Sequence, residues 1–455
     1  MSRNAKFILN IVIIVLVIGL LAGGIYFLTR PEEQSNMSDS HTDDDRIKIF
    51  SYAMDELTGA EVSNQYGSYS LSRTGNSWTM AGFENVTLNA TALDNLIVTF
   101  QNVTSEGRIE EDPADLSVYG LDNPSATLTL ITAGGSKTFY IGNETPDGTG
   151  SYFNTDSSDD VYIMESYKVD VIRLTAKNYV TIAAGIADTD ITGVRVEGSG
   201  GVLEVKMQPT GPKDQYGLRS YWDIIEPVKQ TASNSDVSNN LITPISKLED
   251  GVTGVLEIND ENLAETRLDS PEYTVTVTTV TGVVTYEISA VSGEYRYLRR
   301  SDVPYLMRVD ADACTFVYTQ PYDVAEKLLA QIDIGIVQEV NIEHKGNTYT
   351  LTILNGSGED AAFYYNGMQV DTDTYRKLYQ NIVVIPVSGE AEGEVARENL
   401  LGSIQYVLNS GEALTLEFVP YNDRNYAVFV DGECLYTVAK KNVDKIFSKV
   451  RETFK

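Results

Sequence analysis

Histidine, cysteine and basic side chains are scarce in this 455-residue sequence, and each shortage excludes a class of function. Two histidines, His41 and His344, are too few for a His-rich metal centre. Two cysteines, Cys314 and Cys434, exclude a disulfide framework, and we expect both to be small buried or half-buried residues. Lysine and arginine total 34 against 65 acidic residues, and the resulting net charge of −31 repels phosphate backbones and anionic lipid headgroups. We therefore expect no nucleic-acid partner.

The longest uncharged apolar run lies near the N-terminus. Residues 7–28 hold no charge and one strongly polar side chain, Asn10. A helix of that length reaches roughly 33 Å, enough to cross a hydrocarbon core of about 30 Å. Arg3 and Lys6 precede the run and acidic residues follow it, so the positive-inside bias places residues 1–6 in the cytoplasm. We expect an uncleaved signal anchor, because the run is longer than the apolar region of a signal peptide.

Residues 29–46 follow this run and are polar, acidic and without apolar periodicity. This composition predicts a flexible, solvated linker. His41 stands beside three aspartates there, and we interpret that group as part of the linker and not as a metal site. The bulk of the chain is then expected on the outer side of a cell membrane, held by one membrane-spanning helix.

A single unit recurs three times after the linker. LTGAEV, from Leu57, aligns with ITGVRV, from Ile191, at an offset of 134 residues. Trp78 then aligns with Trp222 at an offset of 144, because the second copy has gained residues in an intervening loop. The third copy is fainter but keeps its register: Val194, Val196 and Glu197 align with Val340, Ile342 and Glu343 at an offset of 146. Repetition of this kind predicts tandem structural units of one design.

Within each unit, alternating apolar and polar residues predict a hairpin and a second set of strands, with helical segments between and after them. VQEVNIEHKGNTYTLTIL, from Val337, is a clear hairpin with its turn at residues 344–347. We therefore predict an α+β protein in which an N-terminal transmembrane helix precedes three tandem, related units of antiparallel sheet with helices. The predicted segments are a cytoplasmic tip (1–6), a transmembrane signal anchor (7–28), an acidic flexible linker (29–46), repeat unit 1 (47–183), repeat unit 2 (184–333) and a divergent repeat unit 3 (334–455).

Two helices are expected in each unit. The first covers residues 90–103, 235–248 and 371–385 in the three units, with N-caps at Thr91, Ser235 and Thr372 and a kink at Pro244. The second closes each unit, at residues 166–180, 321–333 and 441–454.

Leu-Asp-x-Pro occurs twice, at residues 121–124 and 268–271, each time before an alternating apolar run. Proline has no amide hydrogen, so Pro124 and Pro271 suit the first residue of a strand. The aspartates can fold back onto the backbone as turn residues, and the leucines are expected to anchor the turn in the core. We interpret the motif as an entry turn into an antiparallel sheet and not as a site of chemistry.

The segment from Tyr119 to Ser166 resembles a bacterial membrane-anchored family called domain of unknown function 4340. The features shared with that family are Gly120-Leu121-Pro124, Ile141-Gly142, Tyr152-Phe153 and Val161-Tyr162, together with the N-terminal anchor. Unit 2 departs from the pattern at Arg267, and unit 3 lacks the entry turn. The resemblance implies no known activity and no catalytic residues. Family genes often neighbour ABC-type transport components of the gliding-motility-associated kind, which implies an extracytoplasmic accessory subunit.

No candidate site in the sequence survives a test of its chemistry, so we predict no catalytic, cofactor-binding or metal-binding residues. NTDSSDDVYIME, from Asn154, spaces oxygen ligands like a calcium loop, but Asp159 stands where that loop needs glycine. His344 is expected at a solvated hairpin tip, a poor place for a general base. EGSGGV, from Glu197, is glycine-rich but leads into a strand and not into a helix N-terminus.

Three functions remain open. The first is a non-enzymatic, membrane-anchored extracytoplasmic scaffold or accessory subunit, with ABC transporter subunits or cell-envelope components as partners. The second is a module that binds cell wall or polysaccharide through rows of exposed tyrosines, although we expect most of the 28 tyrosines to pack in the core. The third is a hydrolase that uses a carboxylate pair, which sequence spacing alone cannot reveal.

Overall fold

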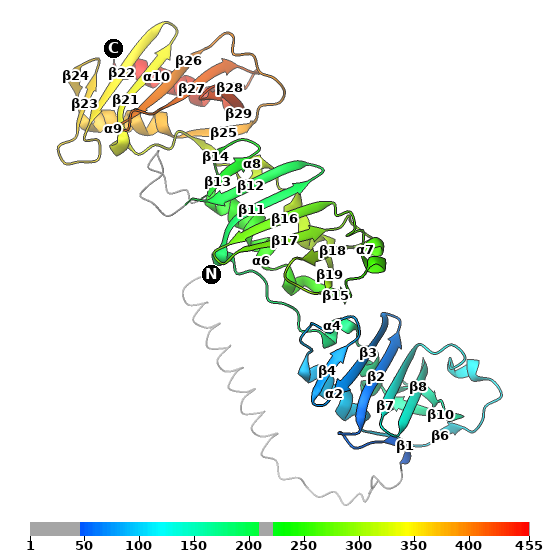
Figure 1. Ribbon diagram of the computed structural model, residues 1–455. Helices are drawn as coiled ribbons and strands as arrows, with labels where there is room; N and C mark the ends of the chain where they lie inside the picture. Colours follow the sequence, from blue (N-terminus) through cyan, green and yellow to red (C-terminus); the bar gives the residue numbers. More distant parts are fainter. Residues whose placement is uncertain (1–45, 209–221, 455) are drawn as a thin grey trace, which may run out of the picture.

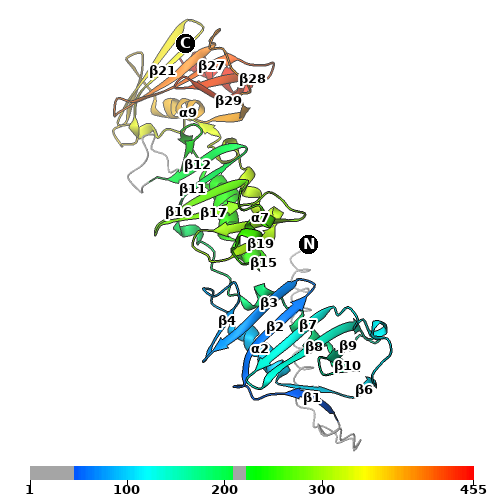
Figure 2. The ribbon, with the colours of Figure 1, turned by 45° about the vertical axis from the view of Figure 1, so that its right-hand side comes forward.

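Three large antiparallel sheets follow one another in a row in the computed structural model, which describes residues 46–208 and 222–454 (Figures 1 and 2), and β1 and β5 form a separate two-stranded sheet in the first unit. The predicted cytoplasmic tip (1–6), the transmembrane helix (7–28) and nearly all of the acidic linker lie outside the described residues. Within the ranges that are described, no helix combines the length and the apolar character that a membrane crossing requires. The prediction of a mixed helix-and-sheet protein with several antiparallel sheets is confirmed.

The elements divide among the three sheets in chain order. The first unit holds β1 (Ile47–Ser51), β2 (Leu57–Asn64), β3 (Gly67–Thr74), β4 (Ser77–Met80), α2 (Ala90–Phe100), β5 (Asn102–Ser105), β6 (Arg108–Glu110), β7 (Ala126–Thr132), β8 (Gly135–Glu144), β9 (Gly150–Thr155), β10 (Ser158–Glu165), α3 (Ser166–Ile172) and α4 (Ala176–Tyr179). The second holds β11 (Ile191–Gly198), β12 (Gly201–Met207), β13 (Trp222–Glu226), β14 (Gln230–Thr231), α5 (Asn234–Val237), α6 (Thr243–Ser246), β15 (Val252–Leu256), α7 (Asp260–Thr266), β16 (Tyr273–Thr279), β17 (Val283–Ile288), β18 (Tyr295–Arg300), β19 (Leu306–Asp310) and α8 (Pro321–Val324). The third holds β20 (Leu328–Leu329), β21 (Val337–His344), β22 (Asn347–Leu354), β23 (Ala362–Tyr365), β24 (Met368–Val370), α9 (Thr372–Val383), β25 (Ile385–Glu390), β26 (Gly402–Leu408), β27 (Ala413–Pro420), β28 (Asn425–Val430), β29 (Glu433–Ala439) and α10 (Lys440–Thr453).

All three sheets share one connectivity. The strand orders are β4-β3-β2-β7-β8-β9-β10-β6, then β14-β13-β12-β11-β16-β17-β18-β19-β15, then β24-β23-β22-β21-β26-β27-β28-β29-β25-β20. In each unit an opening hairpin forms one side of the sheet. A strand after the first helix crosses to the other side and pairs with the last strand of the sheet: β6, which comes after β5, pairs with β10, β15 with β19, and β25 with β29.

A shared irregularity sets the register of the three units. The opening strand of each unit skips one residue in its pairing with β7, β16 or β26, at positions 58, 192 and 338. These positions are separated by the same 134 and 146 residues that relate the sequence repeats. A bulge adds local twist and bends its strand, so the three sheets receive the same bend at the same place.

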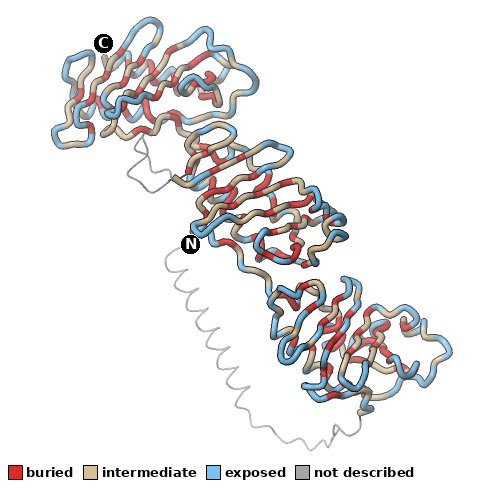
Figure 3. Tube along the Cα trace, in the orientation of Figure 1, coloured by how far each residue is buried: buried red, intermediate tan, exposed pale blue. Residues whose placement is uncertain are grey.

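The core of each unit lies between its sheet and the helices that cover one face of it (Figures 1 and 3). Alternate strand residues are buried, as Ala126, Leu128 and Leu130 are in β7. In α2, Leu93, Leu96 and Phe100 are buried at the three-to-four-residue spacing that puts them on one face of a helix. The opposite faces of the central strands are rich in half-buried threonine.

The predicted N-caps were wrong by one or two residues. The side chains that cap the first helix of each unit belong to Asn89, Ser233 and Asp371, and not to Thr91, Ser235 and Thr372. A π-helical segment, Ser238–Ile242, lies between α5 and α6 just before Pro244, where we predicted a kink. Proline removes one intrahelical hydrogen bond, and the wider turn before it accommodates the loss.

The predicted closing helix of unit 2, residues 321–333, was largely wrong. Only α8 is helical, and Leu328–Leu329 forms β20, which pairs with Pro386 and Ile385 at the edge of the third sheet. Strand pairing with the next unit therefore overrides a local sequence that favours helix. β1 occupies the same place in unit 1, where it pairs with β5.

The two Leu-Asp-x-Pro turns anchor the strands as expected, with one difference in detail. Leu121 and Leu268 are buried, and each follows a residue in the left-handed region, Gly120 (φ 69°) or Arg267 (φ 60°). The prolines do not begin the strands. They precede Ser125 and Glu272, whose amides make the first bonds to the neighbouring strand, and β7 and β16 begin one residue later.

Candidate functional site

The two joints between neighbouring units are built from equivalent elements. At the first joint α4 contacts β15, and a backbone bridge joins Leu88 to Val180 just before the chain leaves unit 1. At the second joint the equivalent bridge joins Ala232 to Ala325, and β20 adds to β25. Both joints therefore bring the end of one unit onto the far-edge strand of the next.

One tyrosine per unit marks these joints. Tyr162, Tyr305 and Tyr436 are equivalent in the sequence repeat, and the latter two reach back to the preceding unit. The Tyr305 hydroxyl accepts a hydrogen bond of 2.8 Å from the amide of Ala183, and the Tyr436 hydroxyl donates to the side-chain oxygen of Gln230. No described unit precedes unit 1, and Tyr162 donates to Asp160 within its own strand.

A buried ion-pair network holds the first joint from within unit 2. Arg300 donates to the carbonyl of Ala184 at 2.8 Å and to the carboxylate of Glu249 at 2.9 Å. The hydroxyl of Tyr286 donates to the same carboxylate oxygen at 2.9 Å, and Asp302 pairs with Arg300 from the solvent side at 2.7 Å. Glu249 and Arg300 are 5% and 7% exposed, so their charges satisfy one another and not water.

A second buried arginine lies on the same strand. Arg296 is 1% exposed, pairs with Glu272 at 2.8 Å and donates to the hydroxyl of Tyr318 at 2.6 Å. Its guanidinium also lies over the ring of Tyr273, 5.4 Å from the centroid, a geometry that adds cation–π attraction. These contacts use the guanidinium for packing, so Arg296 is not free to bind an anion.

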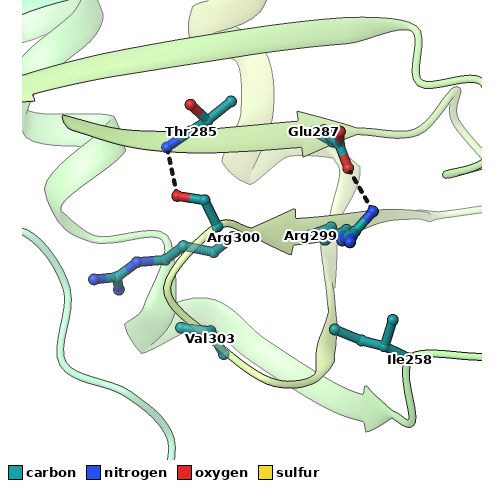
Figure 4. A pocket seen from close by; sticks show the side chains of 7 residues that line it. Ile258, Thr285, Glu287, Arg299, Arg300 and Val303 are labelled. Atoms are coloured by element: carbon teal, nitrogen blue, oxygen red, sulfur yellow. Dashed lines mark hydrogen bonds and ion pairs between the residues drawn. The ribbon is translucent and has the colours of Figure 1, made fainter.

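A pocket of about 300 Å³ opens at the first joint, beside Arg300 (Figure 4). Its lining comes from the loop after β15, from β17 and β18, and from the turn after β18: Ile258, Thr285, Glu287, Arg299, Arg300, Ser301 and Val303. Glu287 pairs with Arg299 at 3.4 Å, and the Thr285 amide donates to the Ser301 hydroxyl at 3.0 Å. The side chain of Arg300 turns away from the other labelled residues (Figure 4), and it donates to the carbonyl of Ala184.

The chemistry available in this pocket is limited to weak polar binding. Its one ion pair, Glu287 with Arg299, has no net charge. Its hydroxyls belong to Thr285 and Ser301, and the seven described lining residues include no histidine or cysteine. A serine nucleophile needs an adjacent base to remove its proton. The pocket therefore offers a polar cleft at a joint and not an assembled catalytic group.

The candidate residues from the sequence lie apart from one another. His344 is half-buried and not at a solvated tip as predicted, because its ring stacks on Phe447 with centroids 4.3 Å apart. Burial, together with Lys345 and Arg451, lowers the pKa of His344. Cys314 is buried and Cys434 half-buried, as predicted, and burial raises the pKa of the Cys314 thiol to about 12.

The two oxygen-rich motifs are parts of hairpins. Residues 154–165 cover the end of β9, a turn and β10, and Asp160 in β10 pairs with Arg108 at 3.0 Å. EGSGGV is the turn between β11 and β12. Across residues 46–208 and 222–454, no three His, Cys, Asp or Glu side chains are grouped to hold a metal ion.

Sequence analysis missed the buried arginines, although a signal for them exists. In YRYLRR, Arg296, Leu298 and Arg300 alternate with half-buried residues, so both arginines lie on the inward face of β18. A charged residue on the buried face of a strand requires a partner. The partner of Arg300, Glu249, is 51 residues away in sequence, and no local pattern identifies it.

The match to a known family covers part of the first two units. Residues 78–249 match the family model described as domain of unknown function (DUF4340), from within β4 to the end of the helical region before β15. Searches of curated proteins and of solved structures found no match. Residues 78–249, which include the Tyr119–Ser166 segment singled out in the sequence, are thus similar to the DUF4340 family.

Proposed function

We propose that this protein is a non-enzymatic scaffold or accessory subunit, held to a membrane by residues 7–28 and projecting its three units on the outer side. The partner that the family resemblance implies is an ABC-type transport complex of the gliding-associated kind. The observation that carries the proposal is the repetition of one joint, which strings the units end to end without an assembled catalytic group among the described residues. A row of jointed units with a polar surface presents area for binding and not a reaction centre.

Wall or polysaccharide binding gains less support. Three described tyrosines are largely exposed, Tyr66, Tyr167 and Tyr318, and they lie at non-equivalent places in their units. Twelve are buried and the other described tyrosines are half-buried, so the tyrosines form no repeated exposed row that could follow a polymer. A carboxylate-pair hydrolase likewise finds no supporting pair in the pocket, where Glu287 is the one carboxylate.

The test is crosslinking in native membranes, followed by purification through a C-terminal tag and mass spectrometry. The matched control carries residues 1–46 fused to an unrelated soluble domain, which measures what the N-terminal segment alone retrieves. We expect transporter subunits with the full chain and not with the control. Recovery of the chain alone, or with glycan fragments, would contradict the proposal, and equal recovery in both samples would assign the contact to the N-terminal segment.

A further inference from the structure

The joints inside this chain pair an exit face with an entry face. We define the entry face of a unit as its far-edge strand with the joint tyrosine, and the exit face as the last turn of its closing helix with the loop before its first helix. Unit 1 contributes its exit face, α4, to the entry face of unit 2 at β15. Unit 2 contributes β14 and the segment from α8 to β20 to the entry face of unit 3, where Tyr322 packs against Tyr436.

One face of each kind has no partner among the described residues. The entry face of unit 1 consists of residues 106–118, which include β6, and of Tyr162, at the edge of the first sheet. β1 pairs with the adjacent β5 in the place that β20 takes at the second joint, and the outer side of β6 stays unpaired among the described strands. The exit face of unit 3 consists of β24 and the last turn of α10, residues 450–453, which align with α4 in the repeat. Figures 1 and 2 show these two faces at opposite ends of the row.

The surface around each open face carries charge of opposite sign. Residues 106–118 of the entry face hold five exposed acidic side chains and one basic one, Arg108, which is already paired with Asp160 and Glu111. The exit face itself holds one exposed charge of each sign, Arg451 and Glu452, but the whole of α10 that leads to it exposes four basic and two acidic side chains, in a chain whose net charge is −31. Opposite potentials on two surfaces favour and orient their encounter.

Exposed apolar side chains lie within both charged faces. Ile109 and Val118 on the entry face are 46% and 67% exposed, and Met368 on the exit face is 65% exposed. An apolar contact inside a charged rim is the usual anatomy of a protein interface. β6 is three residues long and wholly exposed, and its outer side pairs with no other described strand.

We propose that copies of this chain associate head to tail, with the exit face of unit 3 of one copy against the entry face of unit 1 of the next. The contact repeats between molecules the joint that the chain makes twice within itself. Such a heterologous contact extends into a row of copies unless the rotation closes it into a ring. The inference goes beyond the proposed function and does not depend on any transporter partner. The chain's own linker is a poor occupant of the entry face, because both are acidic.

The test is sedimentation velocity on the full chain in detergent, over a range of concentrations. We expect species larger than the monomer that grow with concentration and fall back in about 1 M salt, where the Debye length is about 3 Å. Glu110→Lys with Glu111→Lys reverses the entry face, and Lys449→Glu with Arg451→Glu reverses the exit face. Each pair should abolish growth, and all four substitutions together should restore it.

A mixture of the two reversed variants gives the sharpest result. Each variant keeps one native face, and the two reversed faces are again opposite in charge, so the mixture should grow with concentration although neither variant grows alone. Growth of the mixture also shows that both variants fold. Glu265→Lys with Glu294→Lys, two exposed acids of unit 2, is the matched control and should leave assembly unchanged. A monomer at every concentration would overturn the proposal. Association that survives both reversals would overturn it as well, because such association, for example pairing through residues 7–28, does not use the two faces.

Discussion

Replacing Glu249 with alanine tests whether the buried network holds unit 2 and its joint together. The substitution removes a carboxylate that accepts from both Arg300 and Tyr286, and leaves the guanidinium 7% exposed. Breaking a buried pair costs about 3–5 kcal/mol, because one charge stays buried without its partner. Asp302 still pairs with Arg300, so we expect a loss of about 3 kcal/mol, at the lower end of that range.

The assay is chemical denaturation followed by tryptophan fluorescence. Trp222 is 4% exposed and lies in unit 2, so a background with Trp78 replaced by phenylalanine reports that unit alone. Glu249→Gln is the matched control, since it keeps the volume and the acceptor for Tyr286, and it should cost about 1.5–3 kcal/mol through the weakened bond to a charged group.

A cycle with Arg300→Met separates the pair from its surroundings. The double variant Glu249→Leu with Arg300→Met buries no lone charge, so it should lose less stability than the two single changes summed. A loss below about 1 kcal/mol for Glu249→Ala, within the ordinary range of surface changes and weak contacts, would refute the role assigned to this network.

Three further predictions concern single residues. Arg267→Gly should stabilise unit 2 by about 1 kcal/mol in the same assay, because Arg267 holds a left-handed conformation that costs most residues about that much. Gly120→Ala at the equivalent position should destabilise unit 1, measured with Trp78 in place as the reporter of that unit. The stability that neutral His344 contributes should be complete above pH 6.5 and should be lost as pH falls through the lowered pKa of His344 in the folded state. His344→Gln should flatten this part of the curve of unfolding free energy against pH. An unchanged slope would contradict the assignment. Cys314 should resist a maleimide at neutral pH until the protein is denatured, because its thiol is buried with a pKa of about 12, and rapid native labelling found at Cys314 by peptide mapping would show that its helix opens.

Strands and repeats could be predicted because their signals are local. Alternation along Val337–Leu354 identified a hairpin whose strands end at His344 and begin again at Asn347, on either side of a two-residue turn. The repeat offsets of 134 and 146 residues likewise relate the bulges of the three sheets. A strand that covers a core shows apolar residues at every second position, because each side chain that points inward has to be apolar. This alternation can be read from the sequence alone.

Edges and joints could not be predicted, because they depend on partners far along the chain. Ala325–Ala330 is rich in helix-forming residues, and only Ile385 and Pro386, more than fifty residues later, explain why Leu328–Leu329 is extended. Arg300 shows the same difficulty for the candidate site, since its burial is tolerated only through Glu249 and Asp302. Local propensity decides such segments only when no distant strand or charge competes.

β6, β15 and β25 each cross to the far edge of their sheet, and this crossing has a consequence for folding during translation. β6 cannot pair until β10, about fifty residues later, has left the ribosome, and β15 waits likewise for β19. β25 can pair with β20, which is made before it, but its other side waits for β29. At about 5–20 residues per second, each far edge stays open for several seconds of translation. During that interval the finished unit upstream is the nearest folded surface to the growing sheet. The joint elements that precede each new sheet, such as β20, are then already made when its edge closes, so assembly of the row proceeds in one direction from unit 1.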